Sequence, residues 1–186
     1  MRKLIAGINM TLDGYCDHTA TVVDDEIHQH YNELLKNGGT LMFGRITYQL
    51  MESFWPSVVK KPTGNQPIDE FAVLIETIPK IVFSRTLKEV KWKNTELKKE
   101  VIKEEILYLK SQPGKNILAG SRSLILTLMQ LDLIDEYQLC VQPIILGSGL
   151  PLFKNITDRV DLKLSGSKTF GCGAITLYYE PAQQRK

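Results

Sequence analysis

The chain has 186 residues, of which 43% are hydrophobic and 24% are charged, and its formal net charge at pH 7 is +2. These values are ordinary for globular proteins and exclude disordered, fibrous and coiled-coil classes, and the balanced charge argues against nucleic acid as a partner. The length fits a single domain, which we place at residues 1–181, with residues 182–186 as a disordered tail.

Cysteine usage and hydropathy point to the compartment. Cys16, Cys140 and Cys172 are widely separated and form no Cys-x-x-Cys pair, which argues against a disulfide framework and against a zinc site. The apolar run after Arg2 and Lys3 is soon interrupted by polar residues, so we expect no signal peptide. No segment approaches the ~18 apolar residues that span a bilayer. We therefore expect a cytoplasmic protein that binds neither membrane nor metal.

Strands and helices alternate along the first half of the chain, which is typical of an α/β fold. We expect strands at residues 4–10, 40–43, 80–84 and 94–97. Helices should begin at residues 24–26, at 44–45 and at 67, and a long charged helix should precede Pro113-Gly114. Gly38-Gly39 is expected to end the first helix, and the polar segment between Trp55 and Pro67 is expected to be a loop.

The segment from residue 115 to 153 indicates a phosphate-binding turn. A short apolar strand at residues 116–119 is followed by Gly120 and then by apolar residues at helical spacing, with Ser121 as the expected N-cap. A helix that begins directly after a strand directs unpaired backbone N–H groups and the positive end of its dipole at the edge of the sheet. Residues 161–168 and 174–179 then predict an antiparallel hairpin.

Three strand–helix or strand–loop junctions carry an arginine: Gly44-Arg45, Ser84-Arg85 and Gly120-Ser121-Arg122. Ligands of open α/β sheets bind beyond the carboxyl ends of the strands, so these junctions could converge on one anion. Three arginines would suit the phosphates of a dinucleotide, in particular the 2′-phosphate of NADPH. The alternative is that they are three unrelated surface side chains.

Several short motifs, in this order and spacing, resemble the dihydrofolate reductase-like superfamily. Within it, the chain is most similar to stand-alone relatives of the RibD C-terminal domain, the reductase domain of the bifunctional riboflavin-biosynthesis deaminase-reductase. The resemblance runs almost end to end. Its motifs are TLDG at 11–14, MFGRITY at 42–48, FWP at 54–56, IVFSR at 81–85, LIDE at 133–136, PIILGSG at 143–149 and LF at 152–153.

The resemblance implies a mixed, largely parallel sheet flanked by helices, NADPH as the cofactor, a small-molecule substrate and a homodimer. It also implies eight cofactor-binding residues: Gly44, Arg45 and Thr47 at the first phosphate-binding helix, Ser84 and Arg85 near the 2′-phosphate, and Gly120, Ser121 and Arg122 at the turn under the pyrophosphate and nicotinamide. Ala119 and Ser121 stand where the family often has Gly, so crowding of the cofactor is expected there.

Fewer residues are candidates for catalysis than for cofactor binding. Dihydrofolate reductases place an acid on the first helix, whereas here Asp24, Asp25 and Glu26 come too early, and the matching turn carries His28. We interpret the three acids as groups that complement the helix dipole. Asp13, at the end of the first strand, is our candidate for orienting the substrate or relaying a proton, with an Asx-turn role as the alternative.

Trp55 is a candidate for the wall of the substrate pocket, or else packs in the core. The leading hypothesis for function is a reductase similar to 5-amino-6-(5-phosphoribosylamino)uracil reductase. The chain lacks the His-x-Glu and Pro-Cys-x-x-Cys signature of the deaminase partner. The alternatives are a pterin or dihydrofolate reductase and a non-enzymatic NADPH-binding protein.

Overall fold

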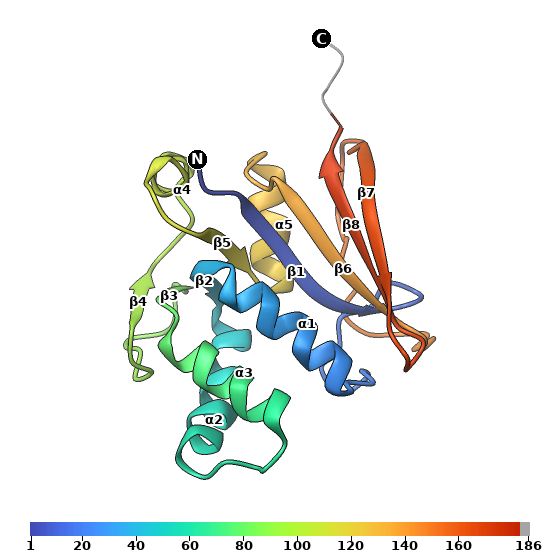
Figure 1. Ribbon diagram of the computed structural model, residues 1–186. Coiled ribbons are helices and arrows are strands. Elements are labelled where there is room, and N and C mark those ends of the chain that lie inside the picture. Colours follow the sequence, from blue (N-terminus) through green and yellow to red (C-terminus); the bar gives the residue numbers. More distant parts are fainter. Residues whose placement is uncertain (183–186) are drawn as a thin grey trace.

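The computed structural model describes residues 1–182, in which an eight-stranded sheet is flanked by five helices (Figure 1). The strands are β1 (Leu4–Thr11), β2 (Gly38–Gly44), β3 (Lys80–Phe83), β4 (Thr95–Lys98), β5 (Asn116–Ala119), β6 (Glu136–Gln142), β7 (Leu162–Thr169) and β8 (Ile175–Pro181). The helices are α1 (Asp25–Lys36), α2 (Arg45–Lys60), α3 (Gln66–Thr77), α4 (Lys103–Ser111) and α5 (Arg122–Gln130).

The strand order is β4-β3-β2-β5-β1-β6-β8-β7, and the first six strands of this order are parallel to one another. β8 runs antiparallel to β6 and forms the C-terminal hairpin with β7. The expected fold class, a largely parallel mixed sheet with a C-terminal antiparallel hairpin, is therefore confirmed. Of the predicted tail, Ala182 donates its backbone N–H to the carbonyl of Asp161, and residues 183–186 lie outside the described residues.

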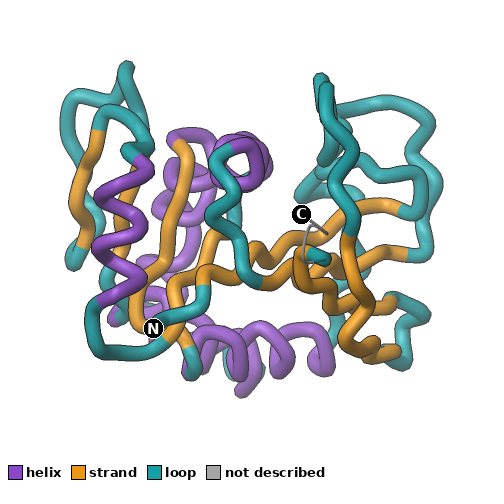
Figure 2. Tube along the Cα trace, turned by 90° about the horizontal axis from the view of Figure 1, so that it is seen from above, coloured by secondary structure: helices purple, strands orange, loops and turns teal. Residues whose placement is uncertain are grey.

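The two larger hydrophobic clusters lie on opposite faces of the sheet, because consecutive residues of a strand face opposite sides. Leu4 and Ala6 of β1 pack on the side covered by α5, whereas Ile5 packs on the side covered by α1, α2 and α3. Figure 1 shows α1, α2 and α3 grouped on one side of the sheet with α5 on the other, and Figure 2 shows helices on both sides of the strands. Both faces of the parallel region are thus covered, as parallel sheets require.

The first helix begins where its acids predict, and it ends differently from the prediction. The carboxylate of Asp24 accepts a hydrogen bond from the backbone N–H of Ile27 at 2.9 Å and caps α1. Asn37 terminates the helix, and Gly38 and Gly39 belong to β2. A side chain at position 38 would place its Cβ 2.6 Å from Cδ1 of Leu118, so close packing against β5, and not helix termination, accounts for glycine there.

The predicted loop between Trp55 and Pro67 is confirmed only over residues 61–65, because α2 continues through Pro56 to Lys60 and α3 begins at Gln66. A proline inside a helix removes a hydrogen bond and costs about 3 kcal/mol. Tertiary packing overrides this cost: Val58 is 5% exposed, and the ring of Trp55 lies 4.5 Å from the ring of Phe71 on α3. The prediction also overestimated the length of α4, which has nine residues.

Candidate functional site

The carboxyl edge of the sheet brings the three predicted junctions together. β3, β2 and β5 are neighbours in the sheet, and parallel pairing places their carboxyl ends at the same edge. Since neighbouring strands lie about 4.8 Å apart, the residues that follow these strands occupy a short stretch of that edge. Ser84-Arg85, Gly44-Arg45 and Gly120-Ser121-Arg122 therefore follow three consecutive strands, as the sequence predicted from the α/β pattern.

The starts of α2 and α5 are joined directly. The backbone N–H of Gly44 donates to Oγ of Ser121 at 2.9 Å, and Ser121 is 2% exposed. Ser121 thus occupies the predicted N-cap position of α5, but its hydroxyl accepts from the start of the other helix and makes no cap bond within α5. A Cβ on Gly44 would lie 3.3 Å from Oγ of Ser123, so the two helix starts are in close contact.

These two helix starts differ from those of α1 and α3. Asp24 and Asn65 cap α1 and α3 through their side chains, whereas α2 and α5 have no side-chain cap. The first backbone N–H groups of α2 and α5 are consequently available to an external acceptor. Two adjacent sets of such groups, each at the positive end of a helix dipole, can bind the two phosphates of a pyrophosphate.

The three arginines have different surroundings. Arg45 is exposed, and its Nη1 donates to Oε1 of Gln49 at 3.1 Å. Arg85 is exposed and forms an ion pair with Glu100 at 3.1 Å. Such surface contacts contribute little, so both guanidinium groups can turn to a phosphate. The Nε of Arg122 instead donates to the carbonyl of Pro151, which ties the start of α5 to the loop after β6.

Ser84 lies just after β3 and shapes the turn that carries Arg85. Its buried hydroxyl accepts from the backbone N–H groups of Thr86 at 3.2 Å and Leu87 at 2.9 Å. A residue of α2 holds the rest of the segment from residue 84 to 94: the hydroxyl of Tyr48 accepts from the backbone N–H groups of Lys91 and Trp92. Sequence reasoning missed this role, although Tyr48 closes the MFGRITY motif.

A buried lysine anchors the same segment. Lys80 is 1% exposed, and its Nζ donates to the carbonyls of Ile78 at 2.9 Å and Glu76 at 3.1 Å. The ammonium group also lies 4.5 Å above the ring of Trp92, whose Nε1 donates to the carboxylate of Glu76. Burial lowers the pKa of Lys80 to about 8, and the Glu76 carboxylate opposes that shift. The cluster fixes the segment that carries Arg85 and lies on the far side of the sheet from α5.

Asp13 holds the turn after β1 to the loop after β6. Its carboxylate accepts from Oγ1 of Thr11 at 2.6 Å, from the backbone N–H of Gly147 at 2.7 Å and from that of Leu146 at 3.1 Å. These bonds, that of Thr11 foremost, lower the pKa of Asp13. The carboxylate is therefore ionised at neutral pH. The carboxylate thus holds the turn after β1 against the loop after β6. A role as a proton relay would require these hydrogen bonds to break.

Trp55 and the unusual turn residues lie in packed environments. Trp55 is half-buried, donates its Nε1 to Sδ of Met51 and packs on Phe71, so its contacts match the packing alternative. Ala119 is 1% exposed within the core beside α5, and Ser121 is turned toward Gly44. Both side chains are thus buried, and the crowding of the cofactor expected from them stays a prediction.

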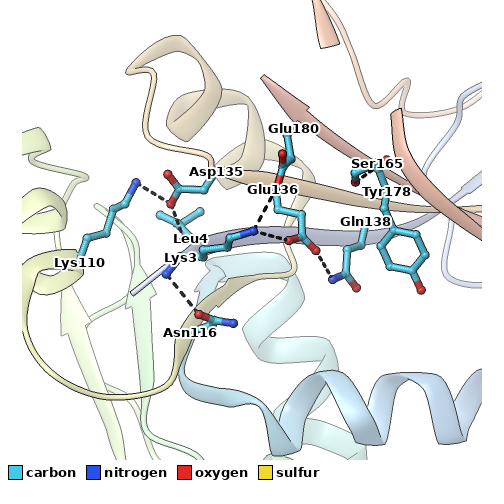
Figure 3. Close-up of polar contacts among 10 residues, drawn as sticks. All are labelled: Lys3, Leu4, Lys110, Asn116, Asp135, Glu136, Gln138, Ser165, Tyr178 and Glu180. Carbon is cyan, nitrogen blue, oxygen red and sulfur yellow. Dashed lines mark hydrogen bonds and ion pairs between the residues drawn. The ribbon is translucent and has the colours of Figure 1, made fainter. Parts of the chain in front are cut away.

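Two cavities lie away from the carboxyl edge. One, of about 450 Å³, is at the amino edge and is lined by Lys3, Asp135 and Glu180 among others. Figure 3 shows the polar contacts around it, including Lys110 Nζ to Asp135 at 2.7 Å. The other, of about 460 Å³, lies between α4 and the β3–β4 pair. Neither is lined by any of the predicted site residues.

Within residues 1–182, the structure contains no group of three His, Cys, Asp or Glu side chains that could hold a metal ion. His28 and His30 have separate surroundings: Nδ1 of His28 lies 3.1 Å from the carbonyl of Asp24, and His30 is buried among aromatic rings. In the same described range, no helix has both the length and the apolar character needed to cross a membrane.

Comparison with known proteins identifies one family model and two curated relatives that match this chain. The family model of the RibD C-terminal domain matches residues 2–176. Uncharacterized protein YyaP of Bacillus subtilis (strain 168) is 32% identical over 182 residues, which cover 96% of this chain and 94% of that protein. Uncharacterized protein YwjB of the same organism is 44% identical over 72 residues, which cover 38% of this chain and 41% of that protein.

Solved structures share the fold. A putative riboflavin biosynthesis protein from Shewanella sp. PV-4 has a TM-score of 0.74 at 22% identity, covering 97% of this chain and 99% of that one. A diaminohydroxyphosphoribosylaminopyrimidine deaminase/5-amino-6-(5-phosphoribosylamino)uracil reductase from Thermotoga maritima has a TM-score of 0.64 at 16% identity. The match covers 97% of this chain and 57% of that longer chain.

Proposed function

The chain belongs to the RibD C-terminal domain family, and on this premise we propose that it is an NADPH-dependent reductase. Its substrate would be a small heterocyclic or ribosyl-linked compound similar to 5-amino-6-(5-phosphoribosylamino)uracil, the compound in the name of the Thermotoga maritima protein. One observation carries the proposal: two uncapped helix starts, joined by the Gly44–Ser121 hydrogen bond, lie side by side at the carboxyl edge. That arrangement suits a pyrophosphate.

Six of the eight candidate residues would contact the cofactor, whereas Ser84 shapes the turn that carries Arg85 and Arg122 binds the loop after β6. The backbone N–H groups that follow Gly44 and Ser121, with the hydroxyl of Thr47, would bind the pyrophosphate oxygens. Arg45 and Arg85 would pair with the 2′-phosphate, which distinguishes NADPH from NADH. Gly120 would allow the nicotinamide end to approach the backbone closely. Bound NADPH supplies the hydride, and the protein orients the two reactants.

Asp13 and Arg122 would act on the substrate side by ordering loops. Asp13 binds the backbone of Leu146 and Gly147, and Arg122 binds that of Pro151, so both residues fix the loop after β6. This loop follows the strand next to β1 and would border the substrate. A direct contact of Asp13 with the substrate stays part of the proposal, because its side chain is exposed. Trp55 would act only through the packing of α2 against α3.

Calorimetric titration with NADPH and with NADH tests the cofactor. Selective binding of NADPH at micromolar affinity supports the proposal, and binding of neither cofactor contradicts it. Oxidation of NADPH is then followed at saturating cofactor with the phosphoribosylaminouracil compound and with dihydrofolate. Turnover of dihydrofolate alone would favour a pterin-type reductase, and NADPH binding without turnover of any acceptor would favour a non-enzymatic protein.

The proposal includes assembly and location. We infer a homodimer from the family resemblance and a cytoplasmic location from the three cysteines, which are all free in the structure. Reduced thiols are expected in a reducing compartment. Small molecules, and neither nucleic acid nor membrane, are the proposed partners.

A further inference from the structure

A chain of four hydrogen-bonded groups crosses the carboxyl ends of β1 and β6. The backbone N–H of Val22 lies 3.1 Å from Oε1 of Gln142, and Nε2 of Gln142 lies 3.3 Å from Oδ1 of Asn9. The hydroxyl of Tyr31, on α1, lies 3.0 Å from the same Oδ1. Gln142 is fully buried, at 0% exposed, whereas Asn9 is only half-buried.

The donor of the first bond determines the orientation of every group that follows. A backbone N–H can only donate, so the oxygen of the Gln142 amide must face Val22. The NH₂ group of Gln142 then faces Asn9, and the atom of Asn9 that meets it must be the oxygen. The Tyr31 hydroxyl donates to that oxygen as well, and burial raises the pKa of Tyr31, which keeps its proton in place.

The orientation of the Asn9 NH₂ group is consequently fixed, and both of its N–H groups are available to an acceptor on a ligand. Within residues 1–182, no group accepts a hydrogen bond from Nδ2 of Asn9, while its Oδ1 accepts two. An amide held in this way is pre-organised, because little side-chain freedom is left to lose on binding a ligand.

Asn9 also lies close to the predicted position of the nicotinamide end. A Cβ on Gly120 would be 3.9 Å from the carbonyl oxygen of Gly7, so the Gly120 turn adjoins β1 at that residue. Asn9 is two residues further along β1 and therefore on the same face, at a distance of about 6.6 Å along the strand. A heterocycle placed beside the Gly120 turn would thus meet the Asn9 amide.

We propose that Asn9 is a substrate-binding residue whose NH₂ group donates a hydrogen bond to an acceptor on the heterocycle, either a ring carbonyl or an unprotonated ring nitrogen. This assignment rests on the proposed reductase function and narrows its substrate class. The ring must present an acceptor at that edge, because a ring N–H there would oppose the fixed donors of Asn9. A uracil ring, with two carbonyl groups, meets the requirement.

Asn9→Asp is the variant that separates this role from a structural one. The carboxylate of the variant keeps an acceptor for Tyr31 and Gln142, and only the NH₂ donors are lost, which have no acceptor within residues 1–182. With the phosphoribosylaminouracil compound as substrate, kcat/KM should fall at least about tenfold, because one substrate hydrogen bond is replaced by repulsion. The melting temperature and the Kd for NADPH should stay at the wild-type values.

The matched control is Asn116→Asp, at the amino end of β5. Oδ1 of Asn116 also accepts a hydrogen bond, from the backbone N–H of Lys3, but it lies at the opposite edge of the sheet. This variant should retain wild-type kcat/KM. Equal kinetics for Asn9→Asp and wild type, or equal losses in the two variants, would overturn the assignment.

A second measurement does not depend on turnover. In a ¹⁵N–¹H spectrum of the NADP⁺-saturated protein, the side-chain NH₂ signals of Asn9 are identified by their absence in Asn9→Asp. Titration with the phosphoribosylaminouracil compound should shift these signals, and unshifted Asn9 signals would overturn the assignment. Absence of NADPH binding in calorimetry would instead contradict the reductase function itself.

Discussion

At the scale of single residues, the structure separates the arginines that are available to a ligand from the one that is engaged. Arg45 and Arg85 are exposed and bound only by surface contacts, whereas Arg122 bonds to the backbone of Pro151. The sequence alone left open whether the three are unrelated surface side chains, because the direction of a side chain depends on residues far along the chain. We therefore propose that Arg45 and Arg85, and not Arg122, bind the 2′-phosphate.

Arg45→Ala and Arg85→Ala should each weaken NADPH binding about tenfold while leaving NADH binding within about twofold, since a charge-assisted hydrogen bond contributes about 1.5–3 kcal/mol. Calorimetric titration of each variant with both cofactors measures the effect. Arg159→Ala is the matched control, because Arg159 is also exposed and also paired with an acid, Asp161. Equal losses for NADPH and NADH would show that the residue does not bind the 2′-phosphate.

His30 gives a prediction on acid stability. It is 8% exposed among Tyr31, Phe170 and Tyr178, and burial, helped by the charge of Lys168, lowers its pKa from 6.5 to about 4. Between these pH values the unfolded chain binds a proton at His30 that the folded protein does not bind. Acid therefore favours unfolding in this range, and the free energy of unfolding falls as the pH drops.

The loss should be on the order of 2 kcal/mol between pH 6.5 and 4, and it should be smaller in His30→Phe, which retains an aromatic ring and cannot be protonated. Urea denaturation of both proteins at several pH values measures the difference. Parallel stability curves for the two proteins would contradict the assignment of this acid sensitivity to His30.

At the scale of elements, the contact between the starts of α2 and α5 is the feature on which the proposed cofactor site depends. The Ser121 hydroxyl and the Gly44 N–H belong to different helices, and their bond sets how the two helix starts lie relative to each other. The Asp13 and Tyr48 contacts play a comparable part for the loops after β6 and β3. The site is thus built from links between elements that are distant in sequence.

Ser121→Ala leaves the Gly44 N–H without its partner and should lower the free energy of unfolding by about 1–3 kcal/mol. The affinity for NADPH should fall as well, because the spacing of the two helix starts is no longer fixed. Ser111→Ala serves as the control: Ser111 is an exposed serine at the end of α4, away from the carboxyl edge, and its hydroxyl donates only to the nearby carbonyl of Tyr108. Unchanged stability and NADPH affinity in Ser121→Ala would refute this role.

At the scale of the whole molecule, the sheet ends in two edge strands, β4 and β7, and neither contains a fully buried residue. All eight residues of β7 are at least partly exposed, with Leu164 at 52%. An uncovered edge strand offers unpaired backbone groups to another chain. This is compatible with the proposed homodimer, for which a sequence pattern alone gives no signal.

Light scattering at micromolar concentration should give twice the chain mass of 21.1 kDa. The measurement should be repeated at 0.5 M salt, where a dimer held by apolar contacts persists because screening weakens only its charged contacts. A mass equal to one chain at both salt concentrations would contradict the dimer.

The sequence by itself determined the order of strands and helices, the C-terminal hairpin and the family resemblance. These features follow from local periodicity and from short motifs, which need no knowledge of distant contacts. It also placed the three junctions correctly, because parallel strands in an α/β sheet necessarily end at one edge. The sequence also located the start of α1 from Asp24, Asp25 and Glu26, since acids at a helix start act locally.

Only the tertiary structure decided the rest. α2 passes through Pro56 because packing on α3 outweighs the lost hydrogen bond, and Gly38 is required by Leu118, 80 positions away in the chain. The Ser121 hydroxyl meets Gly44 across 77 positions, and the Asn9 amide is oriented from Gln142 across 133. The directions of such polar groups depend on partners brought together by folding, and no local pattern encodes them.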